Sequence, residues 1–152
     1  MSEEQTLSQR LLKPATRPDL VRDCVTELEE EVAAQRGLKG LAVKGGYKTV
    51  KAIKPGFISG VLDVLLDEWT VALEDEYQSW KTGDGQGSFG SQLLGKKDLV
   101  AERMLGVTDR RAERSAHTTA KKLYFKLRPA AKNQVVNALP RVTRVLDRYM
   151  DA

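Results

Sequence analysis

Apolar side chains recur at three- and four-residue steps along most of the 152-residue chain. This spacing places them on one face of an α-helix, whereas a half-buried strand alternates apolar and polar positions. No segment shows a convincing alternation of that kind. The pattern therefore predicts an all-α protein, a single domain of about six helices over residues 1–152.

Two helices are expected before the first Lys-Pro-Gly turn. The first apolar stripe begins after Pro18 and closes at Gly37, because proline fits the first turn of a helix and glycine follows the last. A second helix is expected over residues 38–53, and it contains the adjacent pair Gly45 and Gly46. Each glycine costs roughly 1 kcal/mol relative to alanine inside a helix. The pair therefore indicates either a break or a place where another helix packs very close.

The longest apolar face of the chain lies between residues 57 and 80. Pro55 precedes it in a turn that cannot continue the second helix. We expect one helix over 57–80 to be the central element against which the others pack, because its first half is apolar around much of its circumference. Residues 1–16, upstream of the first stripe, are expected to form an N-terminal arm.

A Gly-rich stretch at residues 82–90 separates the central helix from the second half of the chain. It contains GDGQGSFG, which spells the G-x-G-x-x-G of a dinucleotide-binding loop. That loop must follow a strand and open a helix, and here it follows a helix, so we interpret the stretch as a connector. We expect Ser88 to cap the next helix and proteases to cleave readily near Gly85.

The second half predicts further helices and an internal repeat. Thr108 is expected to cap a polar helix, and Pro129 to open a last helix that Pro140 kinks. Shifted by 74 residues, VKAIKPGFISGVLDVL at 50–65 aligns with YFKLRPAAKNQVVNAL at 124–139. The alignment predicts two pseudo-repeated three-helix halves joined by the connector.

The segment GLKGLAVKGGYKTVKAIKPGF at 37–57, together with KLRPAAK at 126–132, resembles a family of uncharacterised bacterial proteins. These all-helical proteins have a Lys-rich Gly-Tyr-Lys region before a Lys-Pro-Gly turn. The resemblance covers most of the chain. It implies a bacterial, all-helical protein and transfers no activity and no site residues.

Charge is unevenly distributed behind the net charge of +4. Residues 1–55 carry a net charge of +2, residues 56–92 carry −6 and residues 93–152 carry +8. An acidic middle between basic flanks can be neutralised within one fold, or it can provide complementary faces of a homo-oligomer. Because of this uneven distribution, the overall basic charge of the protein is weak support for a nucleic-acid partner.

Few features of the sequence indicate where in the cell the protein is located. No run approaches the roughly 18 apolar residues that a membrane span needs, and the N-terminal MSEEQTLSQR is polar and acidic. The lone Cys24 cannot form an internal disulfide and lies on the first apolar stripe, which is typical of a buried thiol in a reducing compartment. These features predict a cytoplasmic protein without a transmembrane segment.

No catalytic constellation is found in the sequence. His117 is the only histidine, and nothing local indicates the nucleophile and the orienting acid that a catalytic triad needs. One cysteine and one histidine cannot make a zinc site of the usual composition in a monomer. The sequence therefore predicts a protein that is not an enzyme, with no cofactor and no metal.

Three carboxylates, Asp63, Asp67 and Glu74, lie at four- and seven-residue steps on one side of the expected central helix. Carboxylates so placed could bind a divalent cation or share a proton. The alternative is a solvated or salt-bridged acidic face turned towards the basic helices. We favour this alternative and take the three residues as a candidate partner face.

The best candidate for a functional surface is basic. Lys44, Lys48, Lys51 and Lys54 fall within about 120° of one face if their segment is a continuous helix, with Tyr47 beside them. A second basic patch comprises Arg110, Arg111, Arg114, Lys121 and Lys122. Such patches can bind the phosphates of nucleic acid or of anionic lipid headgroups, although no named nucleic-acid motif is present.

Three functions are compatible with these features. The first is a non-catalytic interaction or regulatory module that binds a protein partner, or further copies of itself, through charged and apolar helix faces. The second is binding of nucleic acid, another anionic ligand or a membrane surface through the face from Lys44 to Lys54. The third is a small-ligand pocket between the halves, lined by the aromatic residues Tyr47, Trp69, Tyr77 and Trp80.

Overall fold

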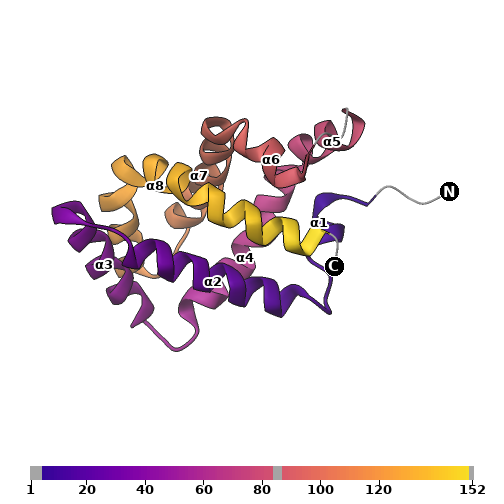
Figure 1. Ribbon diagram of the computed structural model, residues 1–152. Helices are drawn as coiled ribbons and strands as arrows, with labels where there is room; N and C mark the ends of the chain where they lie inside the picture. The colour runs from indigo at the N-terminus through magenta and orange to yellow at the C-terminus, as the bar shows by residue number, and fades with distance from the viewer. Residues whose placement is uncertain (1–4, 84–86, 151–152) are drawn as a thin grey trace.

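The computed structural model describes residues 5–83 and 87–150, and this part of the chain forms eight α-helices and no strand (Figure 1). The helices are α1 (Leu7–Leu11), α2 (Arg17–Ala33), α3 (Gly37–Lys51), α4 (Phe57–Ala72), α5 (Glu74–Thr82), α6 (Phe89–Leu94), α7 (Lys97–Glu113) and α8 (Thr118–Met150). The all-α prediction is confirmed, with two more helices than the six that the sequence suggests. Across the described residues, no helix is both long enough and apolar enough to cross a bilayer.

The helices pack around α4 and α8. α8 contacts α7, α6 and α2, and α4 contacts α7 and α2. In Figure 1, α2 and the yellow C-terminal part of α8 run alongside each other across the molecule, with α3 at one end and α5 and α6 at the other. The two ends differ in how completely they are filled.

The main core lies where α1, α5, α6 and the C-terminal half of α8 meet. Tyr77 packs edge-to-face on Phe89 with ring centroids 5.7 Å apart, and each side chain is 1% exposed. A T-shaped pair adds about 0.5–1.5 kcal/mol to the stabilisation from buried area. The buried members of this cluster are Leu7, Leu11, Leu73, Tyr77, Phe89, Leu93, Val100, Leu139, Leu146 and Met150. A smaller cluster contains Leu20, Val21, Leu66 and Val145.

Part of the expected N-terminal arm belongs to this core. Thr6 caps α1 by accepting a hydrogen bond from the Gln9 N–H, and the Gln9 side chain accepts one from the Thr6 N–H, which makes a capping box. Leu7 and Leu11 are buried. Residues 7–11 therefore form a packed helix. The apolar pattern does not predict it, because two apolar positions four residues apart are too few to show a period.

The single helix expected over 57–80 is divided at Leu73 into α4 and α5. The chain leaves helical geometry at Leu73 (φ −98°, ψ 5°), and α5 begins with the acidic residues Glu74, Asp75 and Glu76. Carboxylates are favoured at the start of a helix because the helix dipole is positive there. The acidic triplet is thus a start signal inside a pattern that apolar spacing alone presents as continuous.

Two boundaries expected in the second half are wrong. Thr108 caps no helix, because it lies inside α7, where its hydroxyl donates to the Leu105 carbonyl oxygen (3.0 Å). Pro129 opens no helix, because α8 continues through both Pro129 and Pro140. An interior proline removes one backbone hydrogen bond and bends a helix. In Figure 1 the orange and yellow parts of α8 accordingly run in different directions.

The two segments that align in sequence do not begin equivalent helices. Pro55 lies in the turn before α4, whereas Pro129 lies inside α8. The helix arrangement therefore does not reproduce the predicted pair of three-helix halves.

The connector between α5 and α6 is shorter than the predicted 82–90. α5 extends through Thr82, and α6 begins at Phe89. Residues 84–86, with the predicted cleavage site near Gly85, lie outside the described residues.

The predicted cap at the start of α6 is confirmed. Ser88 Oγ accepts a hydrogen bond from the Ser91 N–H (3.1 Å). The Gly90 N–H also donates to the carboxylate of Asp147 in α8 (2.8 Å). These two hydrogen bonds satisfy backbone donors that the first turn of a helix leaves without partners, and the second one joins α6 to α8.

The adjacent glycines of α3 have different surroundings. The helix is continuous through both, and Gly46 packs against α8, where an added Cβ would lie 3.2 Å from Leu127 Cδ1. An added Cβ at Gly45 would meet no atom within 4 Å. Of the two sequence interpretations, close packing therefore applies, and it applies to Gly46.

We expect Gly45→Ala to raise the free energy of unfolding by roughly 0.5–1 kcal/mol, because alanine restricts the unfolded chain and fits the open site. Gly46→Ala should gain less or destabilise, because Leu127 has to shift. Denaturant titrations of both variants beside the unaltered protein measure the difference. Equal stabilisation by the two substitutions would contradict the close packing of α3 on α8.

Candidate ligand-binding pocket

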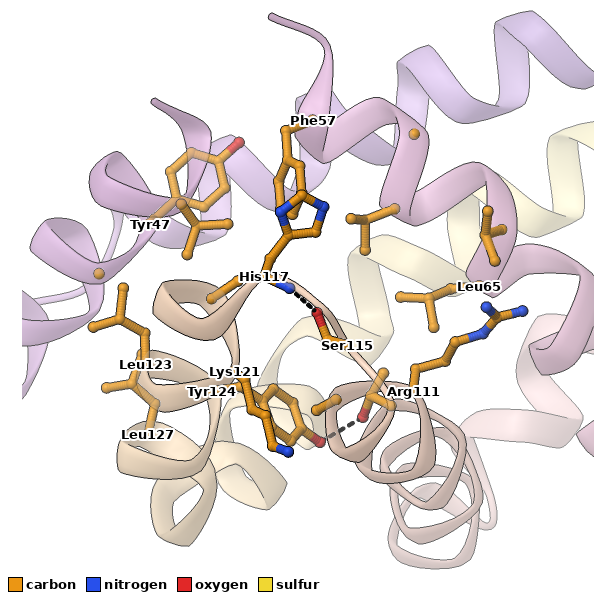
Figure 2. Close-up of a pocket in the computed structure, with 18 of the residues that line it drawn as sticks. Tyr47, Phe57, Leu65, Arg111, Ser115, His117, Lys121, Leu123, Tyr124 and Leu127 are labelled. Atoms are coloured by element: carbon orange, nitrogen blue, oxygen red, sulfur yellow. Dashed lines mark hydrogen bonds between the residues drawn. The ribbon is translucent and has the colours of Figure 1, made fainter. Parts of the chain in front are cut away.

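A cavity of about 830 Å³ lies where α3, the start of α4, the end of α7 and the start of α8 meet. Figure 2 shows Tyr47 from α3, Phe57 and Leu65 from α4, Arg111 from α7 and Leu123 from α8 around it. Its volume falls within the range of about 300–1,000 Å³ that is usual for small-molecule sites. The cavity thus gathers residues from both halves of the chain.

The wall of the pocket is mainly apolar. Its larger apolar side chains are Leu28, Val32, Val43, Val50, Phe57, Val61, Val64, Leu65, Leu123 and Leu127. Val61 and Val64 remain 38% and 39% exposed, and apolar surface in contact with water costs roughly 25 cal/mol per Å². An apolar ligand in the pocket would remove part of this surface from water.

Small residues keep the space open. Gly56, Gly60, Ala112, Ala116 and Ala120 all line the pocket. An added Cβ at Gly60 would meet no atom within 4 Å, so the structure has room for a side chain that the sequence does not supply. Gly56 adopts a left-handed conformation (φ 74°) in the turn before α4, which favours glycine there for a backbone reason.

The charged residues that line the pocket are cationic. They are Lys54, Arg111, Arg114 and Lys121, and no carboxylate occurs among the described lining residues. Lys121 Nζ donates to the Glu113 carbonyl oxygen (3.0 Å), and Arg114 Nε donates to the Arg110 carbonyl oxygen (3.3 Å). A carbonyl oxygen orients a cation but does not neutralise it, so these contacts leave the rim positively charged.

The other two cations of the rim have side-chain partners. Arg111 Nη2 lies 2.5 Å from Glu68 Oε1 of α4. Lys54 Nζ lies 5.9 Å from the centroid of the Phe57 ring. The His117 imidazole packs edge-on against the same ring, with the two ring centroids 5.0 Å apart. Figure 2 shows His117 beside Phe57 at the edge of the cavity. The pocket therefore combines an apolar interior with a positive edge.

A network of polar side chains joins α7 to α8 at one wall of the pocket. Tyr124 donates its hydroxyl hydrogen to Asp109 Oδ1 (2.5 Å), and Arg128 binds both oxygens of Asp109 at 2.8 and 3.1 Å. The Tyr124 oxygen also lies 2.7 Å from Thr108 Oγ1. The Arg128 guanidinium lowers the pKa of Asp109, and burial raises the pKa of Tyr124 to about 12, with the Asp109 hydrogen bond adding to the shift.

The structure divides the predicted lysine face. Lys54 lines the pocket, whereas Lys51 Nζ binds Glu29 of α2 at 2.7 Å, a hydrogen bond that raises the pKa of Lys51. Lys44 and Lys48 are exposed on α3. One residue of the predicted face therefore reaches the cavity.

The predicted arginine patch is brought to the same cavity. Arg111 and Arg114 line the pocket together with Lys121, and Arg110 is exposed beside them. Lys54 from the first patch and the two arginines from the second thus surround one apolar space. Sequence reasoning treated the patches as separate surfaces because more than fifty positions lie between them.

The three carboxylates of the predicted partner face do not act together. Arg17 of α2 binds Asp63 at 2.7 Å and Asp67 at 2.9 Å, and the Asp67 hydrogen bond lowers the pKa of that carboxyl group. Glu74 instead accepts a hydrogen bond from the Leu7 N–H at the start of α1 (2.8 Å). Sequence reasoning missed Arg17 because no local pattern marks a partner so far along the chain. No group of three His, Cys, Asp or Glu residues is placed to hold a metal ion in the part of the chain that the structure describes.

The aromatic residues expected to line a cavity lie in different places. Tyr47 lines the pocket. Trp69 lies beside a second, inner cavity of about 290 Å³ and donates its Nε1–H to the Met104 carbonyl oxygen (3.1 Å). Tyr77 and Trp80 pack in the main core at the opposite end.

The pocket and the inner cavity adjoin each other. They share the lining residues Leu28, Val32, Val43 and Thr108. The lining of the inner cavity is also mostly apolar, apart from the charged Glu27, Glu31 and Arg141, and comes mainly from α2, α4, α7 and α8. Apolar space therefore continues from the pocket towards the centre of the molecule.

The polar network predicts how stability depends on pH. Because the folded-state pKa of Asp109 is lowered, its contribution is complete above the ordinary carboxyl pKa of about 4 and is lost as the pH falls through the lowered value. We expect Asp109→Asn to cost about 1 kcal/mol at neutral pH, a value reduced for partial exposure. Thermal unfolding should show this deficit shrinking below about pH 4.

Glu113→Gln, at an exposed position of the same helix, serves as the control and should show no comparable deficit. A deficit of Asp109→Asn that stays constant down to the lowest pH tested would contradict the assignment to the ionised carboxylate.

Comparison with known proteins identifies a family without an assigned activity. No curated protein and no solved structure matches the chain. A family described as of unknown function (DUF6918) matches residues 7–150, the span from α1 to α8. The match confirms the resemblance to an uncharacterised family that the sequence indicates. The chain therefore belongs to this family of unknown function.

Proposed function

We propose that the protein is a non-catalytic binding protein whose pocket holds a ligand with an apolar body and an anionic group. One observation carries the proposal: an apolar cavity of about 830 Å³ is lined by four cations and by no carboxylate among its described residues. A purely apolar ligand would leave Arg114 and Lys121 of the rim without an anionic partner. A small anion without an apolar part would leave the wall exposed to water.

The shape of the space favours an elongated ligand. The inner cavity of about 290 Å³ continues from the pocket through shared apolar residues. A chain of methylene groups fits such a space, and each buried methylene contributes about 0.8 kcal/mol. The ligand class is therefore an amphipathic anion, with a hydrocarbon tail directed inwards and a carboxylate or phosphate group near Arg114 and Lys121.

The reactive side chains at the two cavities support binding without catalysis. Ser115 Oγ accepts a hydrogen bond from the backbone N–H of His117 (3.1 Å), while the imidazole packs against Phe57. Cys24 lines the inner cavity, and burial raises the pKa of its thiol to about 11. A thiol with this pKa is protonated at neutral pH and therefore a poor nucleophile.

The ligand class can be tested with three amphiphiles of equal chain length. We expect dodecanoate and dodecyl phosphate to bind below their micelle concentrations and to raise the unfolding temperature, and dodecan-1-ol to bind at least about tenfold more weakly. The double substitution Arg114→Gln and Lys121→Gln should remove most of the preference for the anions. Calorimetric titration gives the affinities.

Filling the pocket provides a second test. Gly60→Leu places a side chain in the open space of the pocket and should weaken binding of all three amphiphiles by at least about tenfold. Gly45→Leu is the matched control, because Gly45 also has no atom within 4 Å of an added Cβ but does not line the pocket. The proposal would be refuted if Gly60→Leu bound the amphiphiles as tightly as the unaltered protein does. It would also be refuted if none of the three amphiphiles bound to the unaltered protein.

A protein partner is the second candidate. Exposed apolar side chains outside the pocket favour it, among them Val71 at 70% and Leu99 at 42% exposure. If these side chains mediate self-association, light scattering should show a mass that rises with protein concentration. The substitution Val71→Ser or Leu99→Ser should then shift the protein towards the monomer, and a monomer at every concentration would exclude the homo-oligomer.

A further inference from the structure

The outer face of α3 carries two leucines that are largely exposed to solvent. Leu38 is 87% exposed and Leu41 is 66% exposed. The inner face of the same helix, with Val43, Tyr47 and Val50, lines the pocket. Because α3 lies at one end of the molecule (Figure 1), its outer face can approach an extended surface.

Lysines lie along one edge of this outer face. At 100° per residue, Lys44 and Lys48 fall within about 60° of Leu41, whereas Lys39 falls on the opposite half of the helix. α3 contains no Asp or Glu. Gly45 lies on the same outer face and has open space around it, so the backbone of the helix can come close to a docked surface.

Carboxylates on the neighbouring helices are engaged elsewhere. Glu29 of α2 binds Lys51, and Arg141 lies within ion-pair distance of Glu30 and Glu31. Within residues 5–83 and 87–150, no carboxylate lies within 4.0 Å of the ammonium groups of the edge lysines, which are Lys44 and Lys48. α8 carries no acidic residue before Asp147. The outer face is therefore apolar along its centre and positive along one edge.

We propose that α3 docks the protein on an anionic lipid bilayer, with Leu38 and Leu41 entering the interfacial region and Lys44 and Lys48 contacting lipid phosphates. A helix that combines exposed apolar residues with a basic edge binds the bilayer surface by both effects. Nucleic acid would engage the lysines but provide no partner for the leucines. The proposal depends on the outer face alone and does not require a ligand in the pocket.

Flotation with vesicles tests the docking. We expect the protein to float with vesicles of phosphatidylglycerol and phosphatidylcholine, and to bind pure phosphatidylcholine at least about tenfold more weakly. Leu38→Ser with Leu41→Ser, and separately Lys44→Gln with Lys48→Gln, should each reduce binding to the anionic vesicles by at least about tenfold. Circular dichroism verifies that the variants remain folded.

Matched controls lie on other helices. Val71→Ser removes an apolar side chain that is as exposed as Leu41. A double substitution of exposed lysines, Lys97→Gln with Lys126→Gln, removes the same charge from α7 and α8. Both should retain binding within about twofold. An equal loss in this double variant would show that net charge acts without α3, and would overturn the proposal.

Two further outcomes are decisive. Absence of flotation with anionic vesicles overturns the proposal. So does binding that depends on the lysines but not on the leucines, particularly if the protein binds duplex DNA with the same dependence. Gly60→Leu should still float, which separates docking by α3 from uptake of single lipids by the pocket, so that either proposal can fail without the other.

Discussion

The packing of the C-terminal half of α8 is the interaction on which the rest of the fold depends. Leu139, Leu146 and Met150 enter the main core, and Val145 enters the smaller cluster with α2 and α4. This stripe follows helical spacing and thereby joins both clusters through one element. The buried hydroxyl of Thr143 donates to the Leu139 carbonyl oxygen (2.8 Å), so the stripe includes a polar residue without an unsatisfied donor.

The pocket follows from the continuity of the same helix. Because α8 runs through Pro129 and Pro140, its first turns are carried to the opposite end of the molecule, where α3 and the start of α4 lie. There the chain supplies Gly60, Ala116 and Ala120, which do not fill the space between the helices. An unfilled apolar cavity costs stability, and a bound ligand would offset that cost by mass action.

The uneven distribution of charge along the chain is reflected in the ion pairs of the folded protein. The acidic middle segment is engaged internally: Asp63 binds Arg17, and Glu76, only 4% exposed, lies 3.1 Å from Lys96. Arg103 lies 3.6 Å from the same carboxylate, so two cations offset the cost of burying this charge. Since the carboxylates are held in these pairs, the cations of the pocket rim and of the outer face of α3 give one end of the molecule a positive surface. Both proposals concern that end.

The sequence by itself determined the features that depend on neighbours within about four positions. These include the all-helical class, the helices that became α2 and α3, and the cap at Ser88, because periodicity and capping are local. It could not settle whether Pro129 starts or crosses a helix, since packing of the surrounding segment decides that. Only the tertiary structure placed Lys54 beside Arg114 and paired Arg17 with Asp63, because these contacts join residues that no local pattern relates.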